Sequence, residues 1–314
     1  MNSRVHPKYK TKYRVTNWAE YDQALVQRGD ITLWITPEAT RAWKAKPSGR
    51  RGAPQKYTDL AIETALTLRL VFRLPLRQAE GFLRSLLDQM GLSLEAPDHT
   101  TLSRRSKGLN VKLAATQSKK PIHLIIDSTG LSIVGEGEWA AAKHGGRGKR
   151  GWRKLHLGVD RAGMIRAQVL TESSGDDAKI GIKVIKKTKG KLARVTGDAA
   201  YDTVAIYAQA GARGARVVIP PTRTASVSGG KPRSAERDKT IRRVAQVGRR
   251  RWKKESGYHR QGTVENAFFR YKSTLGDKLH ARGLAAQKTE VAIGCKILNR
   301  LLGLGSPSSV AVAR

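Results

Sequence analysis

The chain has 314 residues, with 60 lysines and arginines against 25 aspartates and glutamates, and a formal net charge of +35. Such a charge repels itself strongly without a polyanion, so the composition favours nucleic acid, whose neutralised phosphates release counterions. An anionic membrane surface is the rival partner, but no apolar run of about 18 residues could span a bilayer, and the first residues lack a signal-peptide core. The single Cys295 excludes an internal disulfide and a cysteine-based zinc site.

The first 50 residues are basic, and we interpret residues 1–50 as an N-terminal arm. Within this arm, DITLWIT (30–36) alternates apolar and polar residues and predicts a short strand. The segment KPSGRRGAPQK (46–56) is rich in proline, glycine and charge, which is typical of a linker. We therefore expect a second region to begin near residue 51.

Residues 57–110 predict three helices, which we assign to a DNA-binding region at 51–118. TDLAIETALTLRLVF and LPLRQAEGFLRSLLDQMG have helical spacing, with Thr58 or Asp59 as the first cap, and Asp98 caps a third helix in PDHTTLSRRSKGL. A short basic third helix favours a helix-turn-helix-like reader, whose groove-facing residues would be His99, Thr100, Ser103, Arg104 and Arg105. A plain helical bundle stays open, because the connection GLSLEAPD is too long for the standard turn.

Residues 119–222 predict a strand-rich core. Three apolar segments in hairpin order predict an antiparallel meander: PIHLIIDSTGLSI, WRKLHLGVD and MIRAQVLTES. The next segments alternate between helix and strand: DAKIGIKVIKKTKG, LARVTGDAAYD, DTVAIYAQAGA and ARVVIPP. The predicted order is β-β-β-α-β-α-β, which is an α/β fold with a mixed five-stranded sheet and flanking helices.

The rest of this core, assigned to 119–303, contains a basic insertion and two helices. Residues 223–254 hold twelve lysines and arginines against two acids, and we expect this stretch to be mobile without DNA. Helical spacing predicts one helix in RQGTVENAFFRYKSTLGDKL (260–279) and another in AAQKTEVAIGCKILNRLLGL, followed by a loose tail at 304–314.

Three carboxylates stand out by position: Asp127 ends the first apolar strand, Asp198 ends the fourth, and Glu265 lies on the helix after the fifth. Sites in α/β sheets collect at strand ends, so Asp127 and Asp198 would approach each other if the first and fourth strands are neighbours. Converging carboxylates repel unless a cation lies between them, and Mg²⁺ prefers oxygen ligands. Two such ions can cleave a phosphodiester by activating a hydroxyl and stabilising the leaving oxygen.

Each acid has a simpler interpretation when it is taken alone. An aspartate after a strand is often a turn residue or a helix cap, and a glutamate on a helix often pairs with lysine or arginine. We interpret Asp160 as a structural residue of a hairpin turn and Asp202 as the cap of the next helix. Only the joint pattern singles out Asp127, Asp198 and Glu265.

Four segments resemble the bacterial insertion-sequence five family of DDE transposases: LIIDSTGL, WRKLHLGVD, GDAAYD and YHRQGTVENAFFRYK. The segment KYRVTNWAEYDQAL is similar to the opening of that family, and the resemblance covers roughly residues 10–305. It implies a ribonuclease-H-like catalytic core in which Asp127, Asp198 and Glu265 are catalytic and bind the metal ions.

The most specific part of this resemblance is a Tyr-x2-Arg-x3-Glu-x6-Lys signature. Tyr258, Glu265 and Lys272 match it, whereas Gln261 occupies the arginine position and follows Arg260. The resemblance implies that the non-acidic residues of this segment contact DNA: Tyr258, Arg260, Gln261 and Lys272.

Helical spacing supports Glu265 from the residues alone. The predicted buried stripe of its helix consists of Val264, Phe268, Tyr271 and Leu275. Glu265 and Lys272 are seven residues apart and share an adjoining face. Lys272 can then meet a phosphate of the strand that the metal at Glu265 addresses.

The segment HGGRGKRGWRK (144–154) combines four glycines with many cations between two predicted strands. It predicts a flexible hairpin that grips DNA through Arg147, Lys149, Arg150, Arg153 and Lys154. A merely solvated loop is the alternative.

The resemblance implies a transposase that binds the terminal inverted repeats of an insertion sequence, with Mg²⁺ as cofactor and Mn²⁺ as a substitute. Such an enzyme cleaves the ends to free 3′-hydroxyls and joins them to target DNA. Pairing two ends implies at least a homodimer, and we expect a bacterial cytoplasmic protein associated with the nucleoid. A structure-specific nuclease on the same fold and a non-catalytic DNA-binding protein are the alternatives.

Overall fold

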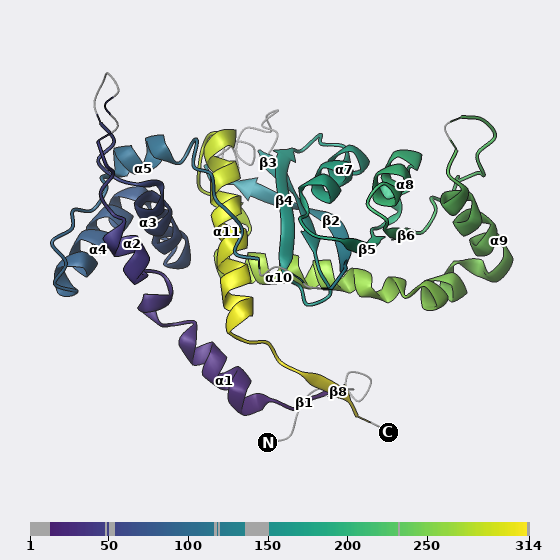
Figure 1. The fold of residues 1–314 in the computed structure, drawn as a ribbon, viewed down its shortest axis with the longest axis horizontal. Coiled ribbons are helices and arrows are strands. Elements are labelled where there is room, and N and C mark those ends of the chain that lie inside the picture. The colour runs from purple at the N-terminus through teal and green to yellow at the C-terminus, as the bar shows by residue number, and fades with distance from the viewer. Residues whose placement is uncertain are drawn as a thin grey trace, which may run out of the picture.

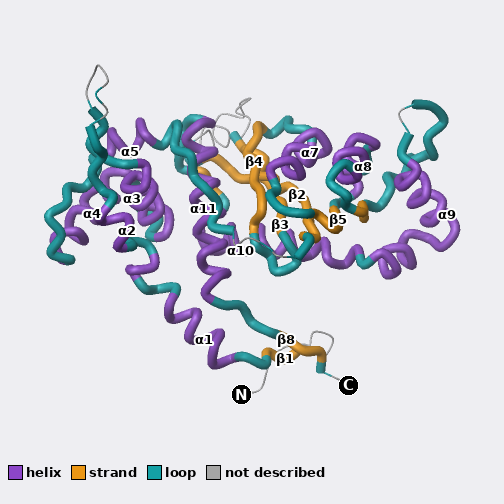
Figure 2. The backbone as a smooth tube through the Cα atoms, viewed as in Figure 1, coloured by secondary structure: helices purple, strands orange, loops and turns teal. Residues whose placement is uncertain are grey.

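The computed structural model describes residues 13–312 except 48, 50–53, 116, 117, 119, 136–150 and 232. A six-stranded mixed sheet lies in the middle of the molecule, with helices on both sides of it (Figures 1 and 2). Its strands are β2 (Ile122–Ile133), β3 (Trp152–Val159), β4 (Ile165–Glu172), β5 (Leu192–Thr196), β6 (Arg216–Val218) and β7 (Lys278–Leu279). The five predicted strands are confirmed, and β7 is a sixth strand too short to give a periodic signal.

The strands follow the order β4-β3-β2-β5-β6, and β7 pairs with the far end of β2. β2, β3 and β4 form the predicted antiparallel meander, while β2, β5 and β6 are parallel. Helix α7 (Asp177–Lys187) connects β4 to β5, and α8 (Val204–Gly211) connects β5 to β6. The first and fourth predicted strands are therefore neighbours, as the site hypothesis requires.

Alternate side chains of β2 enter two different cores. Leu124 and Ile126 belong to the hydrophobic cluster formed with α7 and α8. Ile125 and Leu131 belong to the cluster on the opposite face, formed with α10 (Gly262–Leu275) and α11 (Leu284–Leu304). Both faces of β2 are covered, which explains its nearly continuous apolar sequence.

The helical region consists of α3 (Asp59–Val71), α4 (Leu76–Gln89) and α5 (His99–Arg105), as predicted. Helix α11 lies between these helices and the sheet (Figure 1), and a single hydrophobic cluster runs from α3 through α11 to β2. Neither α11 nor any other helix in the described ranges has the length and apolar character needed to cross a membrane.

The N-terminal segments and the tail differ from the sequence expectations. DITLWIT forms the 3-10 helix η2 (Ile31–Leu33), because the Asp30 carboxylate accepts a hydrogen bond from the Thr32 backbone N–H at 2.8 Å. Two helices flank it, α1 (Trp18–Gln27) and α2 (Pro37–Arg41). The tail is not loose: β8 (Ser309–Ala311) pairs antiparallel with β1 (Tyr13–Val15).

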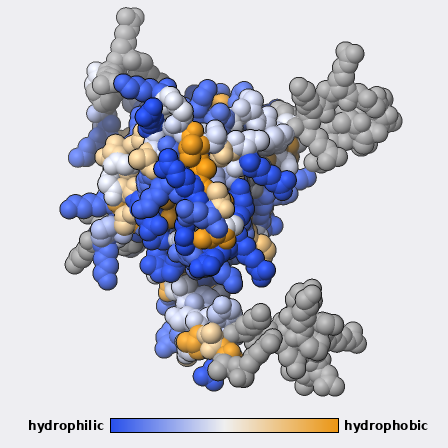
Figure 3. Space-filling view, turned by 90° about the vertical axis from the view of Figure 1, so that its right-hand side faces the viewer, coloured by the Kyte–Doolittle hydropathy of each residue, from blue (hydrophilic) through white to orange (hydrophobic). Residues whose placement is uncertain are grey.

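The basic stretch that we expected to be mobile forms most of helix α9 (Ala235–Ser256). Gly248 has a φ of 76° and kinks this helix, and Arg243 pairs with Glu255 at 2.9 Å across the kink. The Glu236 carboxylate accepts from the backbone N–H of Val217 at 3.0 Å and so satisfies a donor on strand β6. The face of the molecule on the side of α9 is mostly hydrophilic (Figure 3).

Candidate active site

Asp127 lies inside β2, at the level where the neighbouring parallel strand ends. Ile125 of β2 is opposite Thr196, which is the last residue of β5. β2 itself continues to Ile133, so the prediction that Asp127 ends its strand is wrong. The shorter β5 still leaves the Asp127 carboxylate at the carboxyl edge of the parallel pair, where sites of α/β sheets form. Its Oδ1 accepts a hydrogen bond from the Ser128 backbone N–H at 2.8 Å.

The prediction that Asp198 ends its strand is also wrong, because β5 ends at Thr196 and Asp198 follows it at the same edge. A Cβ at Gly197 would lie 3.0 Å from the ring of Tyr201, so a larger residue here would have to displace this ring slightly. Oδ1 of Asp198 accepts from the Ala200 backbone N–H at 3.0 Å and caps the 3-10 helix η3 (Ala199–Tyr201). The capping interpretation of Asp198 is therefore correct, although the cap uses only one of its two carboxylate oxygens.

Glu265 lies in the first turn of α10, which packs against β2. The predicted stripe of α10 is buried, and Ala267 joins it: Val264, Ala267, Phe268, Tyr271 and Leu275. Glu265 itself is exposed beside this stripe. The buried stripe therefore fixes the face on which the carboxylate emerges next to the sheet.

The three acids share one electrostatic environment. Burial raises the pKa of Asp127 to about 6, and the negative charges of three further acids add to this effect: Asp198, Glu265 and Asp177. Burial also raises the pKa of Tyr258 to about 12, and the charges of Asp198, Asp127 and Glu265 again contribute. The charges of carboxylates on β2, after β5 and on α10 thus affect the pKa of Tyr258 together. This is expected of groups that lie around the same edge of the sheet.

Asp177 is a fourth acid at this edge, and its position in the sequence did not single it out. The helix cap of α7 is Asp176, which accepts from the Lys179 backbone N–H at 2.8 Å. Asp177 instead binds the Lys154 ammonium at 2.9 Å through Oδ2, and its buried Oδ1 lies 3.5 Å from Nδ1 of His156. Its charge raises the pKa of Asp198 after the larger effect of burial. The sequence signal that could have identified Asp177 is its place directly after the capping aspartate, Asp176, because one aspartate is enough for the cap.

The donor set at this edge fits a hard divalent cation, because it consists of oxygen ligands. Two buried oxygens here have no hydrogen-bond partner, namely Oε1 of Gln261 and Oδ1 of Asp177. Within the part of the chain that the structure describes, however, no three histidine, cysteine, aspartate or glutamate side chains are grouped closely enough to hold a metal ion as they stand. The charges of the other acids thus raise the pKa of Asp127 although the side chains form no closed ligand cage.

Two family models match the chain, and both are described as a transposase DDE domain. One matches residues 26–136, and the other matches residues 118–300, which is more than half of the chain and contains all four acids. The chain belongs to the DDE transposase family. DNA is the substrate class of this family, and its members generally use divalent metal ions.

In the signature segment of this DDE transposase, some residues lie at the acidic site and others lie in the protein interior. Tyr258 lies in the 3-10 helix η4 (Tyr258–Gln261), close enough to the acids to be affected by their charges. Gln261 is only 5% exposed, and its amide donates to the carbonyl of Ile126 at 3.2 Å, directly before Asp127. The glutamine at the arginine position thus supports the backbone of a catalytic candidate. Lys272 lies half-buried two turns after Glu265.

The cationic hairpin is only partly described in the transposase. Arg147, Lys149 and Arg150 lie outside the described residues. Arg153 donates from Nε to Oε1 of Gln287 at 3.0 Å, and Lys154 is held by Asp177. The two described cations of this segment therefore have partners inside the protein.

Helix α5 uses much of its polar surface for internal contacts. The Asp98 carboxylate accepts from both the backbone N–H and the hydroxyl of Thr100. Arg105 pairs with Asp59 and donates to the carbonyl of Tyr57 at 2.9 Å. His99 faces the Glu80 carboxylate, 2.8 Å from its Nδ1, while Ser103 and Arg104 remain exposed.

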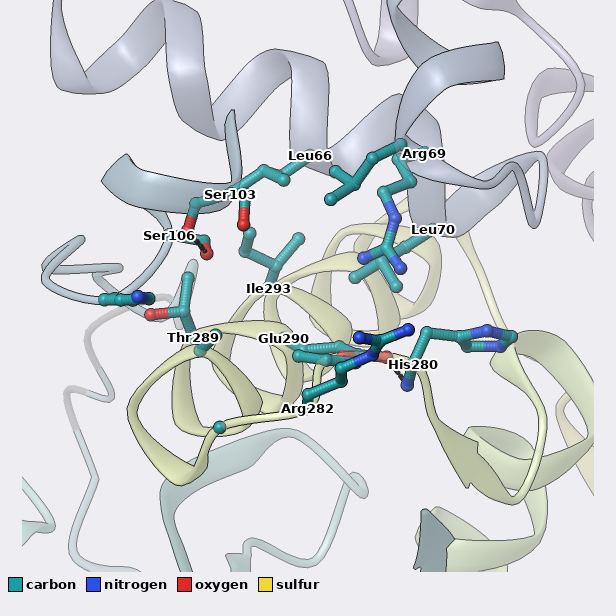
Figure 4. A pocket seen from close by; sticks show the side chains of 15 residues that line it. Leu66, Arg69, Leu70, Ser103, Ser106, His280, Arg282, Thr289, Glu290 and Ile293 are labelled. Carbon is teal, nitrogen blue, oxygen red and sulfur yellow. Dashed lines mark hydrogen bonds between the residues drawn. The ribbon is translucent and has the colours of Figure 1, made fainter. Parts of the chain in front are cut away.

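Ser103 lines a cavity of about 500 Å³ between α3, α5 and the start of α11 (Figure 4). The guanidinium groups of Arg69 and Arg282 enter this cavity from opposite walls, and Lys107 lines it as well. Burial lowers the pKa of Arg69, which the charge of Glu290 partly opposes, and the buried Nε of Arg69 has no hydrogen-bond partner. The cavity is a cationic site at the junction of the helical region and the sheet.

Two other acids have structural roles. Asp160 accepts from two backbone N–H groups of its turn and pairs with Arg166, in agreement with the sequence interpretation. Asp202 does not cap α8, because Thr203 does. Its fully buried carboxylate instead pairs with Arg237 of α9 at 2.8 Å. The prediction for Asp202 was wrong because its partner lies 35 residues later in the chain.

Proposed function

We propose that this chain is the transposase of an insertion sequence of the insertion-sequence five group. It binds the terminal inverted repeats, cleaves phosphodiester bonds to free 3′-hydroxyl ends and joins them to target DNA by direct transesterification. The strand order β4-β3-β2-β5-β6 supports a ribonuclease-H-like core. A homodimer or larger oligomer pairs the two ends on DNA, at the nucleoid of a bacterial cytoplasm.

The single observation that carries this proposal is that acids from separate elements lie around one edge of the sheet, where their charges act on Asp127. Asp127 and Glu265 are 138 positions apart, yet the charge of Glu265 affects the pKa of Asp127. A chain of net charge +35 has many cations available to neutralise acids individually. Several ionised carboxylates close together repel one another and cost free energy, unless a metal ion neutralises them in place of lysine or arginine.

Asp127, Asp198 and Glu265 would hold divalent cations, Mg²⁺ or Mn²⁺, which when bound activate the attacking hydroxyl and stabilise the leaving oxygen. Gln261 keeps the backbone before Asp127 in place, and Asp177 keeps Lys154 beside the site. These contacts limit the positions that the acids can adopt before DNA arrives.

The DNA backbone is held by cations around this edge. Lys272 lies on the same helix as Glu265 and meets a phosphate close to the scissile bond. Farther away, the cavity of Arg69, Lys107 and Arg282 provides a further phosphate contact at the end of β2, because β7 pairs there and leads directly into its wall. The exposed cations of α9 extend the basic surface: Lys239, Arg242, Arg250, Arg251 and Lys254.

A strand-transfer assay with labelled element ends, in Mg²⁺, Mn²⁺ or EDTA, tests this function. We expect cleavage and joining with either metal and neither reaction in EDTA. Asp127→Asn, Asp198→Asn and Glu265→Gln should each abolish both reactions while retaining DNA binding. Glu172→Gln is the matched control, because Glu172 is an exposed acid at the end of β4 on the same edge.

The outcomes separate the rival functions. Cleavage without joining would identify a structure-specific nuclease, and DNA binding without any metal-dependent reaction would identify a non-catalytic DNA-binding protein. Full activity of any one triad variant would overturn the assignment of that residue.

A further inference from the structure

A second basic cavity lies at the opposite end of the parallel strands from the acids. It has a volume of about 380 Å³ and opens where β2, β5 and β6 begin. Four arginines from four different elements line it, together with His123: Arg161 from the β3–β4 turn, Arg194 from β5, Arg216 from β6 and Arg260 from η4. Pro121 and Ala193 complete the lining.

No carboxylate lines this cavity among the described residues, so the four positive charges repel one another. Burial lowers the pKa of Arg194, and the charges of Arg216, Arg260 and Arg161 lower it further. The pKa of His123 falls to about 4, first through burial and then through the charges of Arg194, Arg260 and Arg161. The folded protein therefore holds an uncompensated positive potential at this point.

Two half-buried arginines elsewhere in the protein show what a purely structural role looks like. Arg166 binds Asp160 next to the cavity, and Arg237 binds Asp202. In the cavity, Arg194 donates to the carbonyl of Ser256 at 3.3 Å, which gives it a structural partner. The side chains of the other three make no hydrogen bond or ion pair with any residue that the structure describes, so their donors are free for a ligand.

We propose that this cavity binds backbone phosphates of DNA and forms a contact separate from the catalytic edge. Arginine is suited to this ligand, because its planar fork can donate two hydrogen bonds to one phosphate. A phosphodiester carries one negative charge, so four arginines match a run of adjacent phosphates on a polymer rather than a single small ion. His123 and Asp127 are four residues apart on β2, which separates the two sites by about 13 Å along the strand. The inference uses the proposed function only in taking DNA as the polyanion.

The test removes the two exposed arginines that have no partner, in the double variant Arg161→Gln/Arg216→Gln. DNA affinity of the full chain is measured in EDTA, without cleavage, between 50 and 200 mM salt. We expect the slope of log K against log salt to decrease by about 1.8, because each lost phosphate contact removes about 0.9. The matched control is Arg77→Gln/Lys183→Gln, which removes two exposed cations that do not line this cavity.

Each outcome decides the inference. An unchanged slope in the cavity variant, or an equal decrease in the control, would overturn it. A circular dichroism spectrum and thermal midpoint matching the parent protein exclude misfolding, and Arg161→Lys/Arg216→Lys should restore most of the slope. If inorganic pyrophosphate stabilises the parent protein but not the glutamine variant while the DNA slope stays the same, the ligand is a small anion and not DNA. The salt-slope experiment does not measure cleavage, so an unchanged slope leaves the transposase proposal intact. Conversely, a protein that fails to cleave DNA can still be tested for phosphate binding in the cavity.

Discussion

The two ends of the parallel strands carry opposite charges. At the carboxyl end, the charges of Asp198, Glu265 and Asp177 all act on Asp127. At the amino end, four arginines line one cavity, and none of the described residues lining it is an acid. The acid end cannot attract a phosphate by itself, whereas the arginine end can bind one but has no group that could cleave it. We infer that the sheet places the catalytic acids at one end and an additional DNA contact, without catalytic groups, at the other.

The largest effect that would test this separation is expected at the acid end. Asp127→Asn should reduce cleavage at saturating DNA by about a thousandfold or more, as loss of a central catalytic group does in other enzymes. Its salt slope should equal that of the parent protein. Single-turnover cleavage and fluorescence anisotropy measure the two quantities, and a slope decrease in this variant would contradict the division between the two ends.

A large effect on stability is expected where α9 is anchored beside the sheet. Arg237→Gln leaves the fully buried Asp202 carboxylate without its cation, which should cost about 3–5 kcal/mol of unfolding free energy. Urea denaturation measures this loss. Arg242→Gln removes an exposed charge from the same helix and should change stability very little. Equal losses in the two variants would mean that the ion pair does not anchor α9.

A smaller effect is expected at Gln261, which links the signature segment to the acid end. Gln261→Leu leaves the buried Ile126 carbonyl without its donor, which should cost about 1–3 kcal/mol. Cleavage should fall as well, because this carbonyl directly precedes Asp127. Asn266→Ala, at an exposed position of α10, is the control for helix effects. Unchanged stability and cleavage would show that Gln261 does not support the site.

The smallest effect concerns the pH dependence of the amino end. The folded-state pKa of His123 is about 4, below the ordinary value of about 6.5. The unfolded chain therefore binds the extra proton between these values, and stability falls as pH falls through this window. After a discount for partial solvent screening, we expect a loss of about 1 kcal/mol between pH 7 and pH 5. His123→Gln should flatten this dependence in urea titrations, and DNA in the arginine cavity should raise the pKa of His123 measured by NMR.

The sequence predicted the features that depend on local pattern. The apolar runs gave the strands of the sheet, and the stripe of α10 gave the face of Glu265. Features set by distant partners were missed. Asp202 has the local form of a helix cap, yet its partner is Arg237. The four cavity arginines are spread from position 161 to position 260 and share no motif, so only the folded chain brings them together.

The pairing of β1 with β8 closes the polypeptide into a noncovalent ring. Thr16 and Ser308 are hydrogen-bonded although 292 positions separate them. Closing so large a loop requires nearly the whole chain to be synthesised first, so this ribbon forms at the end of folding. With two exposed three-residue strands, it should also be the first part to open, and hydrogen exchange should be fastest there among the strands.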